Sequence, residues 1–361
     1  MVLNPHPLRA VIGRAPGRVN LIGEHVDYNG FAVLPMAIDR RTEVRATPLA
    51  APVLRVCNAD PGRFPAEEIP LAALATRPPR RTWVDYVVAA ARCRPPVRGV
   101  ELLVSSTVPV AAGLSSSSAL VVATFLALGE AGDRLALAEE ARLAERYVGT
   151  LSGGMDQAIA LLGRPGHCVR IEFRPLRARP IAMPEELVVV VLDSGVPAPK
   201  GGAAQDGYNA RVRECLAAAQ ALGAPAGGLL ADVPGADRRA RAGVLADPLL
   251  RRRASFVFDE AARVDEAEAA LRRGDLAALG ALLDRSHAGL RDLYDVSCPE
   301  LDALVARAKA AGALGARLVG AGFGGCAIAL TTRQAADGFL ARLGGPALVC
   351  VAAGGAERVP V

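Results

Sequence analysis

Short apolar stretches, separated by Gly and Pro, fill the first fifty residues and predict β-strands joined by turns. We expect strands at 32–37 and 42–46, and a further strand at 100–104. A serine-rich stretch, Ala111–Ser118, then opens an apolar run that ends at Leu128, a pattern typical of a helix N-terminus. Because this run is apolar on nearly every side, the sequence predicts a buried helix.

The pattern then changes from strands to helices. A helix is predicted over 135–148, and Ser152 has the character of an N-cap for a helix at 153–162. The Val-rich run 187–192 is typical of a strand covered on both faces.

The remaining half is mostly helical, over 209–222 and 256–309, before a strand, a glycine loop and a strand at 317–330. Strands come first and helices are segregated later, so the predicted class is α+β. The Pro- and Arg-rich segment 174–186 is the expected domain boundary. It divides the chain into residues 1–180 and 181–361.

Composition excludes several classes of protein. Of the 361 residues, 52% are hydrophobic and 22% are charged, which favours a packed globular chain over a disordered one. The net charge of +5 is modest. The densest basic stretch, Arg238–Arg253, has only Phe256 and Phe258 near it and favours a solvated helix face over a nucleic-acid interface. We therefore expect no nucleic-acid partner.

The cysteines and the hydropathy bear on location. The seven cysteines form no Cys-x-x-Cys pair, and scattered single thiols suit a reducing compartment. The first ten residues carry no apolar run, and no unbroken apolar stretch reaches the roughly 18 residues that a membrane helix needs. The sequence predicts a cytoplasmic protein without a membrane partner.

The first candidate for chemistry is the stretch Gly17–Tyr28, where an apolar triplet ends at Gly23 and ionisable side chains follow. The carboxylates of Glu24 and Asp27 suit adjacent sugar hydroxyls, and His25 offers a donor and an acceptor. A polar turn with surface salt bridges explains the same residues equally well.

The second candidate is the serine-rich helix start. Backbone N–H groups at a helix N-terminus bind phosphate, and serine hydroxyls ligate Mg²⁺ beside phosphate oxygens. A capped buried helix is the structural alternative, but it needs one serine rather than four. The lysine of the Walker pattern is absent from this stretch.

Two glycine-containing motifs complete the set. Asp156 lies in the first turn of its predicted helix, where the helix dipole alone is a sufficient reason for a carboxylate. The preceding pair Gly153-Gly154 weakens a helix and indicates a close approach to a ligand, with Asp156 as a general base. The stretch Gly320–Cys326 contains G-x-G-x-x-G, but the residues after it predict a strand instead of the helix that a dinucleotide site requires.

Together these motifs resemble the GHMP small-molecule kinases and, within them, the galactokinases. Gly17–Tyr28 is similar to the galactokinase signature, Val108–Leu120 to the family's ATP motif and Leu318–Cys326 to its third motif. The stretches 208–211 and 286–301 are similar to the same subfamily.

The resemblance implies an α+β, two-domain GHMP kinase fold. Its N-terminal sugar- and ATP-binding domain has a mixed sheet of ribosomal S5 domain 2-like topology, its C-terminal GHMP kinase domain is ferredoxin-like, and the active site lies in the cleft between them. The implied reaction converts α-D-galactose and ATP into α-D-galactose 1-phosphate and ADP with Mg²⁺ as cofactor. A monomer or weak homo-oligomer is expected.

The resemblance also implies roles for individual residues. Asp156 accepts the proton of the sugar C1 hydroxyl. Arg18 stabilises the ionised Asp156 and the transferring phosphoryl group. The implied sugar contacts are Glu24, His25, Asp27, Gly153 and Tyr208. The implied nucleotide contacts are Gly113, Leu114, Ser115, Ser116, Ser117 and Ser118, with Trp83 near the adenine. The implied Mg²⁺ ligands are Ser117 and Glu145.

Some details depart from the galactokinase pattern. Ala111-Ala112 stand where the family's ATP loop often has glycines. The run Gly30–Pro35 and the stretches 115–121 and 144–150 are closer to the N-acetylgalactosamine kinase branch. An N-acetylgalactosamine kinase and a non-catalytic galactose sensor are the alternatives. A mevalonate- or homoserine-type kinase is disfavoured by the sugar-type signature.

Overall fold

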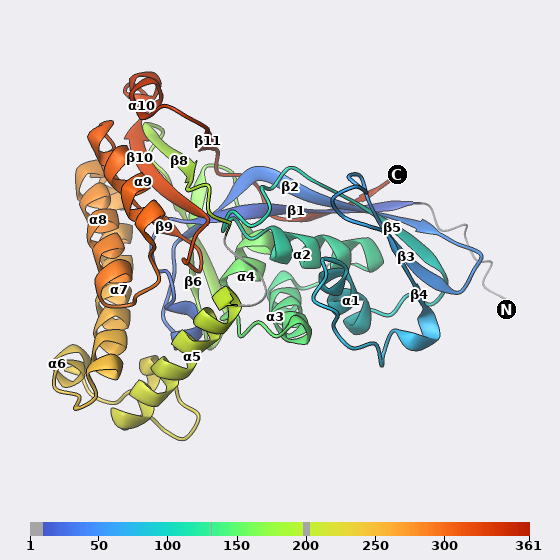
Figure 1. Ribbon diagram of the computed structural model, residues 1–361, viewed down its shortest axis with the longest axis horizontal. Helices are drawn as coiled ribbons and strands as arrows, with labels where there is room; N and C mark the ends of the chain where they lie inside the picture. The colour runs from blue at the N-terminus through green and yellow to red at the C-terminus, as the bar shows by residue number, and fades with distance from the viewer. Residues whose placement is uncertain (1–9, 131, 198–202) are drawn as a thin grey trace.

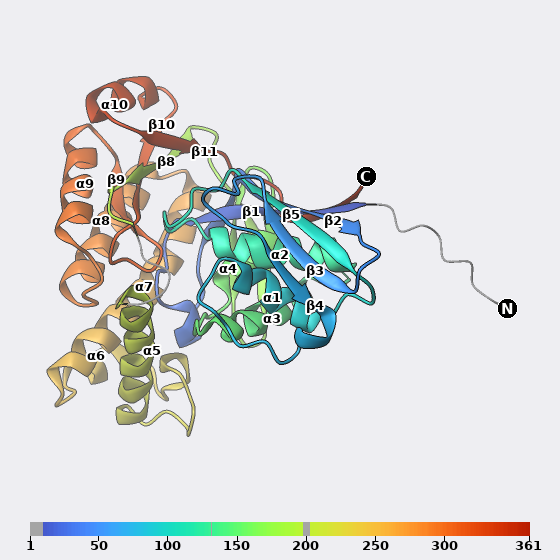
Figure 2. The same ribbon diagram turned by 45° about the vertical axis from the view of Figure 1, so that its right-hand side comes forward.

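A computed structural model describes residues 10–130, 132–197 and 203–361. Residues 1–9 lie outside the described part, and with them nearly all of the ten-residue N-terminal stretch in which we expected no apolar run. The described chain forms two sheets of unequal size, each covered by helices, and a separate hairpin (Figures 1 and 2).

The larger sheet has six strands in the order β12-β1-β2-β5-β3-β4. Neighbouring strands are antiparallel except β3 and β5, which are parallel. The strands are β1 Val11–Asn20, β2 Pro35–Pro48, β3 Val53–Asn58, β4 Glu67–Pro70, β5 Val100–Ser106 and β12 Glu357–Pro360. The last strand of the chain therefore pairs with the first.

Helices cover one face of this sheet (Figure 2). They are α1 Val84–Cys93, α2 Ser116–Leu128, α3 Arg134–Ala144 and α4 Met155–Leu162. Helix α2 lies directly on β1 and β2, and a Cβ atom at Gly13 would lie 2.0 Å from the carbonyl oxygen of Ala123. Glycine at this crossing lets the strand approach the helix closely.

The smaller sheet has the order β11-β8-β10-β9 and is entirely antiparallel. Its strands are β8 Leu187–Asp193, β9 Gly315–Val319, β10 Cys326–Thr332 and β11 Ala347–Cys350, and a separate hairpin joins β6 His167–Glu172 to β7 Arg177–Ala182. The accompanying helices are α5 Ala203–Ala221, α6 Arg238–Gly243, α7 Pro248–Arg273, α8 Leu276–Asp292, α9 Pro299–Ala310 and α10 Ala336–Leu343.

Most predicted elements are confirmed. Helix α2 is buried from Ser118 to Ala127, and β8 is paired on both sides. The 3₁₀ turn that extends α3 ends at Gly149, which has a φ of 84°. The glycine loop at 320–325 joins two antiparallel strands, which rules out a dinucleotide-binding βαβ unit there.

Three local expectations are wrong. The strands expected at 32–37 and 42–46 are not separate: one strand, β2, begins at Pro35 and runs through both, because β1 pairs with it on either side of a register shift opposite Pro16–Arg18. Ser152 is not the N-cap of α4, which begins two residues after the expected position with Gly154 as its N-cap. Arg253 belongs to the basic stretch that we expected to be solvated, yet it is only 2% exposed.

Within the described residues, no helix is both long enough and apolar enough to cross a membrane.

Candidate active site

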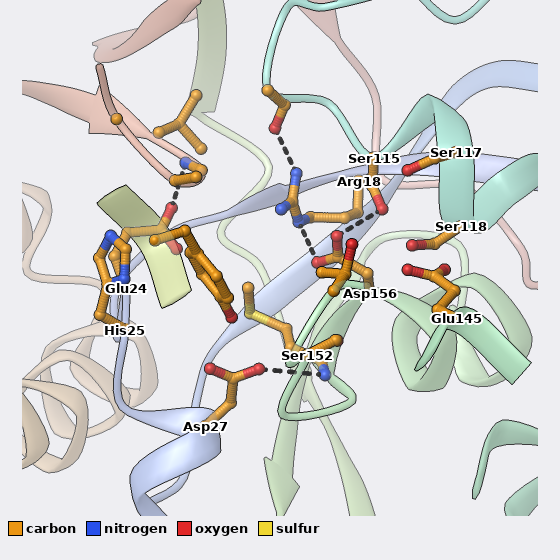
Figure 3. A pocket seen from close by; sticks show the side chains of 18 of the residues that line it. Arg18, Glu24, His25, Asp27, Ser115, Ser117, Ser118, Glu145, Ser152 and Asp156 are labelled. Carbon is orange, nitrogen blue, oxygen red and sulfur yellow. Dashed lines mark hydrogen bonds and ion pairs between the residues drawn. The ribbon is translucent and has the colours of Figure 1, made fainter. Parts of the chain in front are cut away.

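A pocket lies where the two sheets meet, and six chain segments supply its lining. These are the end of β1 with the loop after it, helix α1 at Tyr86, the turn before α2 with the start of that helix, the stretch from the turn after α3 to the start of α4, the start of α5 and the loop between β9 and β10. Figure 3 shows Glu24 and His25 on one side of the pocket and Ser117, Ser118 and Glu145 on the other, with Asp156 between them.

Asp156 is held at the centre of the pocket by two side chains. Its Oδ1 accepts a hydrogen bond from Arg18 Nε at 2.9 Å, and its Oδ2 accepts one from Ser115 Oγ at 2.7 Å. Arg18 also donates to the carbonyl oxygen of Gly113 (Figure 3). The carboxylate side chain is 23% exposed, so it is oriented by its partners and still open to the pocket.

The turn before α2 is strained in a way that aims Ser115 at Asp156. Ala111, Gly113 and Ser115 all have positive φ, and Ser115 has φ 63° and ψ 36°. Two of these three residues are not glycine, and such conformations cost about 1–3 kcal/mol each and cluster at functional sites. The sequence predicted the helix start and could not indicate which serine would turn toward Asp156.

Glu24 is buried beneath the glycine loop. Its Oε1 accepts a hydrogen bond from the backbone N–H of Gly320 at 2.8 Å and lies 3.3 Å from Arg317, which is fully buried. Its Oε2 accepts one from Asn20 Nδ2 at 3.1 Å. Arg317 was missed by the sequence analysis, although a lone arginine in the apolar strand 315–319 was a usable signal.

His25 follows Glu24 in the loop after β1 and has φ 64°, a strained conformation for a non-glycine residue. Its Nδ1 is 3.0 Å from the hydroxyl of Tyr28. Burial, reinforced by the positive charge of Arg211 and opposed by the backbone of Ala321, lowers the pKa of His25 to about 3. The imidazole is therefore neutral at neutral pH.

Asp27 faces the start of α4, where it accepts a 3.4 Å hydrogen bond from the N–H of Met155. Burial and the nearby charge of Asp156 raise the pKa of Asp27 to about 6. A Cβ atom on Gly153 would lie 2.5 Å from the Asp27 carboxyl group and 2.4 Å from the N–H nitrogen of Tyr28. The close approach inferred at Gly153 is therefore an approach to Asp27 and Tyr28.

Tyr208 contributes from α5 and lines the pocket. Its ring centroid lies 5.7 Å from that of His25 and 5.4 Å from that of Tyr28. Burial and the charge of Asp27 raise the pKa of the Tyr208 hydroxyl well above its usual value, so it stays protonated.

Oxygen donors gather on the far side of the pocket. Ser117, Ser118 and Glu145 all line it, and Ser118 Oγ accepts a 3.3 Å hydrogen bond from Gln157. Two hydroxyls and one carboxylate suit a hard cation that keeps other oxygen ligands of its own, as Mg²⁺ does on phosphates. Within the described residues there is no cluster of three or more His, Cys, Asp or Glu side chains that would make an all-protein cage.

A second, wider groove adjoins the pocket and shares Ser117, Tyr86 and Gln205 with it. Ser116 and Trp83 line this groove and not the pocket, while Leu114 is buried behind the turn. Trp83 packs edge-on against Phe64 at 5.9 Å between ring centroids. The predicted residues thus separate into a pocket that holds the ionisable groups and Tyr208, and a groove that holds Ser116 and Trp83.

Two glycine loops close the pocket against each other. A Cβ atom on Gly113 would lie 2.8 Å from the carbonyl oxygen of Val319, and one on Gly320 would lie 3.0 Å from that of Gly113. Both residues have positive φ. The glycines of these two motifs therefore let two backbones pack together.

Comparisons with known proteins agree with this arrangement. The galactokinase galactose-binding signature matches residues 5–48, the GHMP kinase N-terminal domain matches 84–164 and the GHMP kinase C-terminal domain matches 267–347. The galactokinase of Roseiflexus sp. is 41% identical over 93% of this chain and 86% of its own length. Human galactokinase is 38% identical over 89% of this chain and 84% of its own.

Among solved structures, galactokinase of Lactococcus lactis complexed with galactose is similar at a TM-score of 0.88 and 28% identity, over 97% of this chain and 95% of that one. A mevalonate kinase shares the fold at a TM-score of 0.66 and 20% identity, over 94% and 98%. The fold and the domain matches define a GHMP kinase, which confirms the α+β, two-domain prediction. Within that family the chain belongs to the galactokinases.

Proposed function

We propose that Asp156 takes the proton of the galactose C1 hydroxyl in this galactokinase, while Arg18 and the turn before α2 stabilise the transferring phosphoryl group. The protein phosphorylates galactose with ATP, and the proposal concerns which groups do so. The observation that carries it is the position of Asp156 at the end of the serine-rich turn, held from both sides and open to the pocket.

The chemistry needs few groups. The C1 hydroxyl loses its proton to Asp156, its oxygen bonds to the γ-phosphorus, and the bond from that phosphorus to the leaving oxygen of ADP breaks. Such phosphoryl transfer is accelerated mainly by positioning and charge stabilisation. The guanidinium of Arg18 and the first N–H groups of α2 supply positive charge on the phosphoryl side.

The sugar side of the proposal rests on Glu24, His25, Asp27, Gly153 and Tyr208. Acidic oxygens accept hydrogen bonds from sugar hydroxyls, and His25 and Tyr208 offer donors. Because Gly153 leaves no side chain over Asp27, that carboxyl group stays reachable from the pocket.

The nucleotide side rests on Gly113 to Ser118 around the phosphates and on Trp83 near the adenine. Ser117 and Glu145 would hold Mg²⁺, whose charge neutralises phosphate oxygens when it is bound. We also propose that residues 1–180 contribute most of the sugar and ATP contacts, with 181–361 closing the site, and that the reaction takes place in the cytoplasm. The seven free thiols support a reducing compartment.

Asp156→Asn tests the assignment because it removes the base and keeps the shape: the amide oxygen can still accept from Arg18, and the amide nitrogen can donate to the Ser115 hydroxyl. We expect kcat to fall by about 10²–10⁴-fold while ATP still binds. ADP release and sugar 1-phosphate are measured together. Turnover close to that of the unmodified enzyme would remove Asp156 from the role.

The same assay separates the alternatives by substrate. Galactose, N-acetylgalactosamine, glucose and arabinose are compared at matched concentrations. We expect galactose to give the highest kcat/KM. A higher value for N-acetylgalactosamine would move the chain to that branch, and binding of sugar and ATP without ADP release would indicate a sensor.

A further inference from the structure

A buried carboxylate from the C-terminal half of the chain bonds to the backbone of the loop after β1. Glu260 on α7 is 0% exposed, and its Oε1 accepts a hydrogen bond from the backbone N–H of Gly23 at 2.9 Å. Gly23 directly precedes Glu24 and His25, two of the residues proposed above as sugar contacts. Glu260 does not line the pocket, so its effect on a bound sugar passes through this loop.

Two side chains hold the Glu260 carboxylate in place. Ser286 Oγ on α8 donates to the same Oε1 at 2.8 Å, and Arg263 Nε donates to Oε2 at 2.7 Å. The directions of these bonds are fixed, because an ionised carboxylate only accepts. A buried carboxylate is costly unless it is paired and hydrogen-bonded, and Arg263, Ser286 and Gly23 together meet that need.

Gly23 also packs closely against the same helix. It has φ 101°, and a Cβ atom there would lie 2.9 Å from a methyl group of Val264 and 3.2 Å from the Cα atom of Val33. Val264 follows Glu260 by four residues, so both lie on one face of α7. This face therefore contacts Gly23 by a hydrogen bond and by packing.

The carbonyl oxygens of the same loop have a partner of their own. Arg317 on β9 donates to the carbonyl oxygen of Leu21 at 3.0 Å and to that of Asn20. His25, two residues after Gly23, has φ 64°, and such strained conformations persist only where the surrounding structure fixes them. Fixed backbone groups before His25 supply that constraint.

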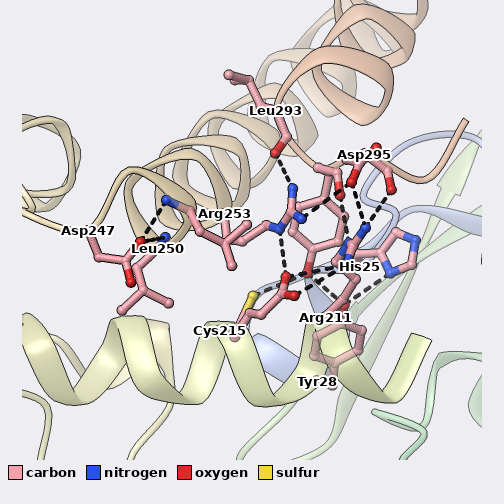
Figure 4. A network of polar contacts seen from close by, with 12 residues as sticks. His25, Tyr28, Arg211, Cys215, Asp247, Leu250, Arg253, Leu293 and Asp295 are labelled. Atoms are coloured by element: carbon pink, nitrogen blue, oxygen red, sulfur yellow. Dashed lines mark hydrogen bonds and ion pairs between the residues drawn. The ribbon is translucent and has the colours of Figure 1, made fainter. Parts of the chain in front are cut away.

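Helix α7 supports His25 by a second route (Figure 4). Arg253, nearer the start of α7, donates to the carbonyl oxygen of Leu293 at 2.6 Å, and Arg211 on α5 donates to that of Tyr294 at 2.7 Å. The ring of Tyr294 packs against that of His25 at 4.8 Å between centroids. The position of this loop therefore depends on α7 at more than one point.

We propose that Glu260 is a positioning residue for galactose recognition: through the N–H of Gly23 it fixes the backbone from which Glu24 and His25 reach the sugar. The proposal rests on the sugar-binding role proposed for those two residues. Without this bond the loop samples arrangements that do not fit the sugar, and the apparent Kd rises as the competent fraction falls. The contacts of Glu260 described above lie away from the nucleotide side, so ATP affinity should stay the same.

Glu260→Gln tests whether the bond holds the loop. The amide puts an NH₂ group where the carboxylate has an oxygen, so either Gly23 or Arg263 meets a donor instead of an acceptor. Hydrogen exchange is measured by mass spectrometry on peptides covering residues 20–28, without sugar or nucleotide. We expect exchange about tenfold faster than in the wild type. Unchanged exchange over this segment would overturn the proposal.

Calorimetric titration then tests the link to recognition. We expect Glu260→Gln to raise the galactose Kd about five- to thirtyfold and to leave the ATP Kd unchanged. Ser286→Ala removes one donor to Glu260 and should raise the galactose Kd about two- to fivefold. It decides the question by both measurements if Glu260→Gln does not fold. An unchanged galactose Kd in the folded variants would overturn the positioning role.

Asp85→Asn is the matched control for loss of a buried acid. Asp85 on α1 is 1% exposed, accepts a hydrogen bond from Arg77 Nη1 at 2.6 Å and accepts another from the backbone N–H of Arg80 at 2.8 Å. We expect it to lower Tm without changing the galactose Kd or the exchange over 20–28. If it raised the galactose Kd as much as Glu260→Gln, the effect would be one of general stability and the positioning role would fall.

His25→Gln distinguishes failure of this proposal from failure of the proposed function. We expect it to raise the galactose Kd. If it does so and Glu260→Gln does not, the positioning role falls and the sugar-binding role of the loop stands. If neither variant weakens galactose binding, both roles fall.

Discussion

Two buried or half-buried acids in this enzyme are treated in opposite ways by their surroundings. Glu268 on α7 is bonded by three arginines, Arg179 and Arg170 from the β6–β7 hairpin and Arg272 from its own helix, at 2.7–3.1 Å. Hydrogen bonding from Arg179 leads the causes that lower the pKa of Glu268 to about 2. At Asp27, burial and then the charge of Asp156 instead raise the pKa to about 6, and hydrogen bonds from backbone N–H groups offset this only in part.

The difference follows from what each acid does. A structural acid is most stable when cations surround it, and its own charge then stabilises the fold. Arginines bonded to Asp27 would occupy the oxygens that we propose for the sugar. The pocket therefore keeps a carboxylate that the fold alone disfavours, and the ligand supplies the missing partners.

The largest effect should come from Asp27→Asn. The folded-state pKa of about 6 lies above the unfolded value of 3.8, so the wild type loses stability as pH rises between these values. A neutral Asn avoids this loss, and we expect it to raise the free energy of unfolding by up to about 3 kcal/mol at pH 8 and by nothing below pH 4. Urea unfolding across this pH range, in parallel with galactose affinity, measures the gain and the expected loss of binding. Equal stability of the wild type and Asp27→Asn at pH 8 would mean that folding does not raise the pKa of Asp27.

A smaller effect isolates the contribution of the second acid. Asp156→Asn removes the charge that is the second cause of the raised Asp27 pKa, so this pKa should fall, by on the order of one unit. Burial remains and keeps the pKa above its ordinary value. A ¹³C titration of the Asp27 carboxyl group in both proteins measures the change. A pKa that stays at its wild-type value in the variant would show that burial alone sets it.

The smallest effect is expected at Glu268, the acid whose pKa is lowered. Glu268→Gln should lower the free energy of unfolding by about 1 kcal/mol at pH 7, since partly exposed ion pairs contribute modestly. Because the folded-state pKa is lowered, this difference should shrink as pH falls from about 4.5 toward 2. Glu185→Gln, at an exposed glutamate before β8, is the matched control and should change nothing. A loss of stability that is independent of pH would mean that packing, not charge, holds Glu268.

Individual residues show most clearly which features were predictable from the sequence. The serine-rich start of α2, the aspartate in the first turn of α4 and the strand–loop–strand at 317–330 are local patterns, and each was predictable from its neighbours in the chain. The resemblance to the galactokinases extended these patterns to residue roles. It supplied Tyr208, whose short polar context carries no signal of its own.

Other features depended on partners that are distant in sequence. Arg317 donates to the carbonyl oxygens of Asn20 and Leu21 nearly three hundred residues away. A lone arginine in an apolar strand marks the residue as unusual but does not indicate which groups it contacts. The break expected between 37 and 42 is absent because β1 pairs with β2 on both sides of it. Arg253 is buried because it donates hydrogen bonds to the carboxylate of Glu214 and to the carbonyl oxygen of Leu293.

The sequence by itself determined the helices, most of the strands and the chemical character of each motif, because hydrophobic period, caps and glycines act over a few residues. Only the tertiary structure decided the state of the side chains in the pocket: the raised pKa of Asp27, the neutral imidazole of His25 and the serine that turns toward Asp156. These properties are set by burial and by charges brought close in space, and a linear order of residues does not specify either distance.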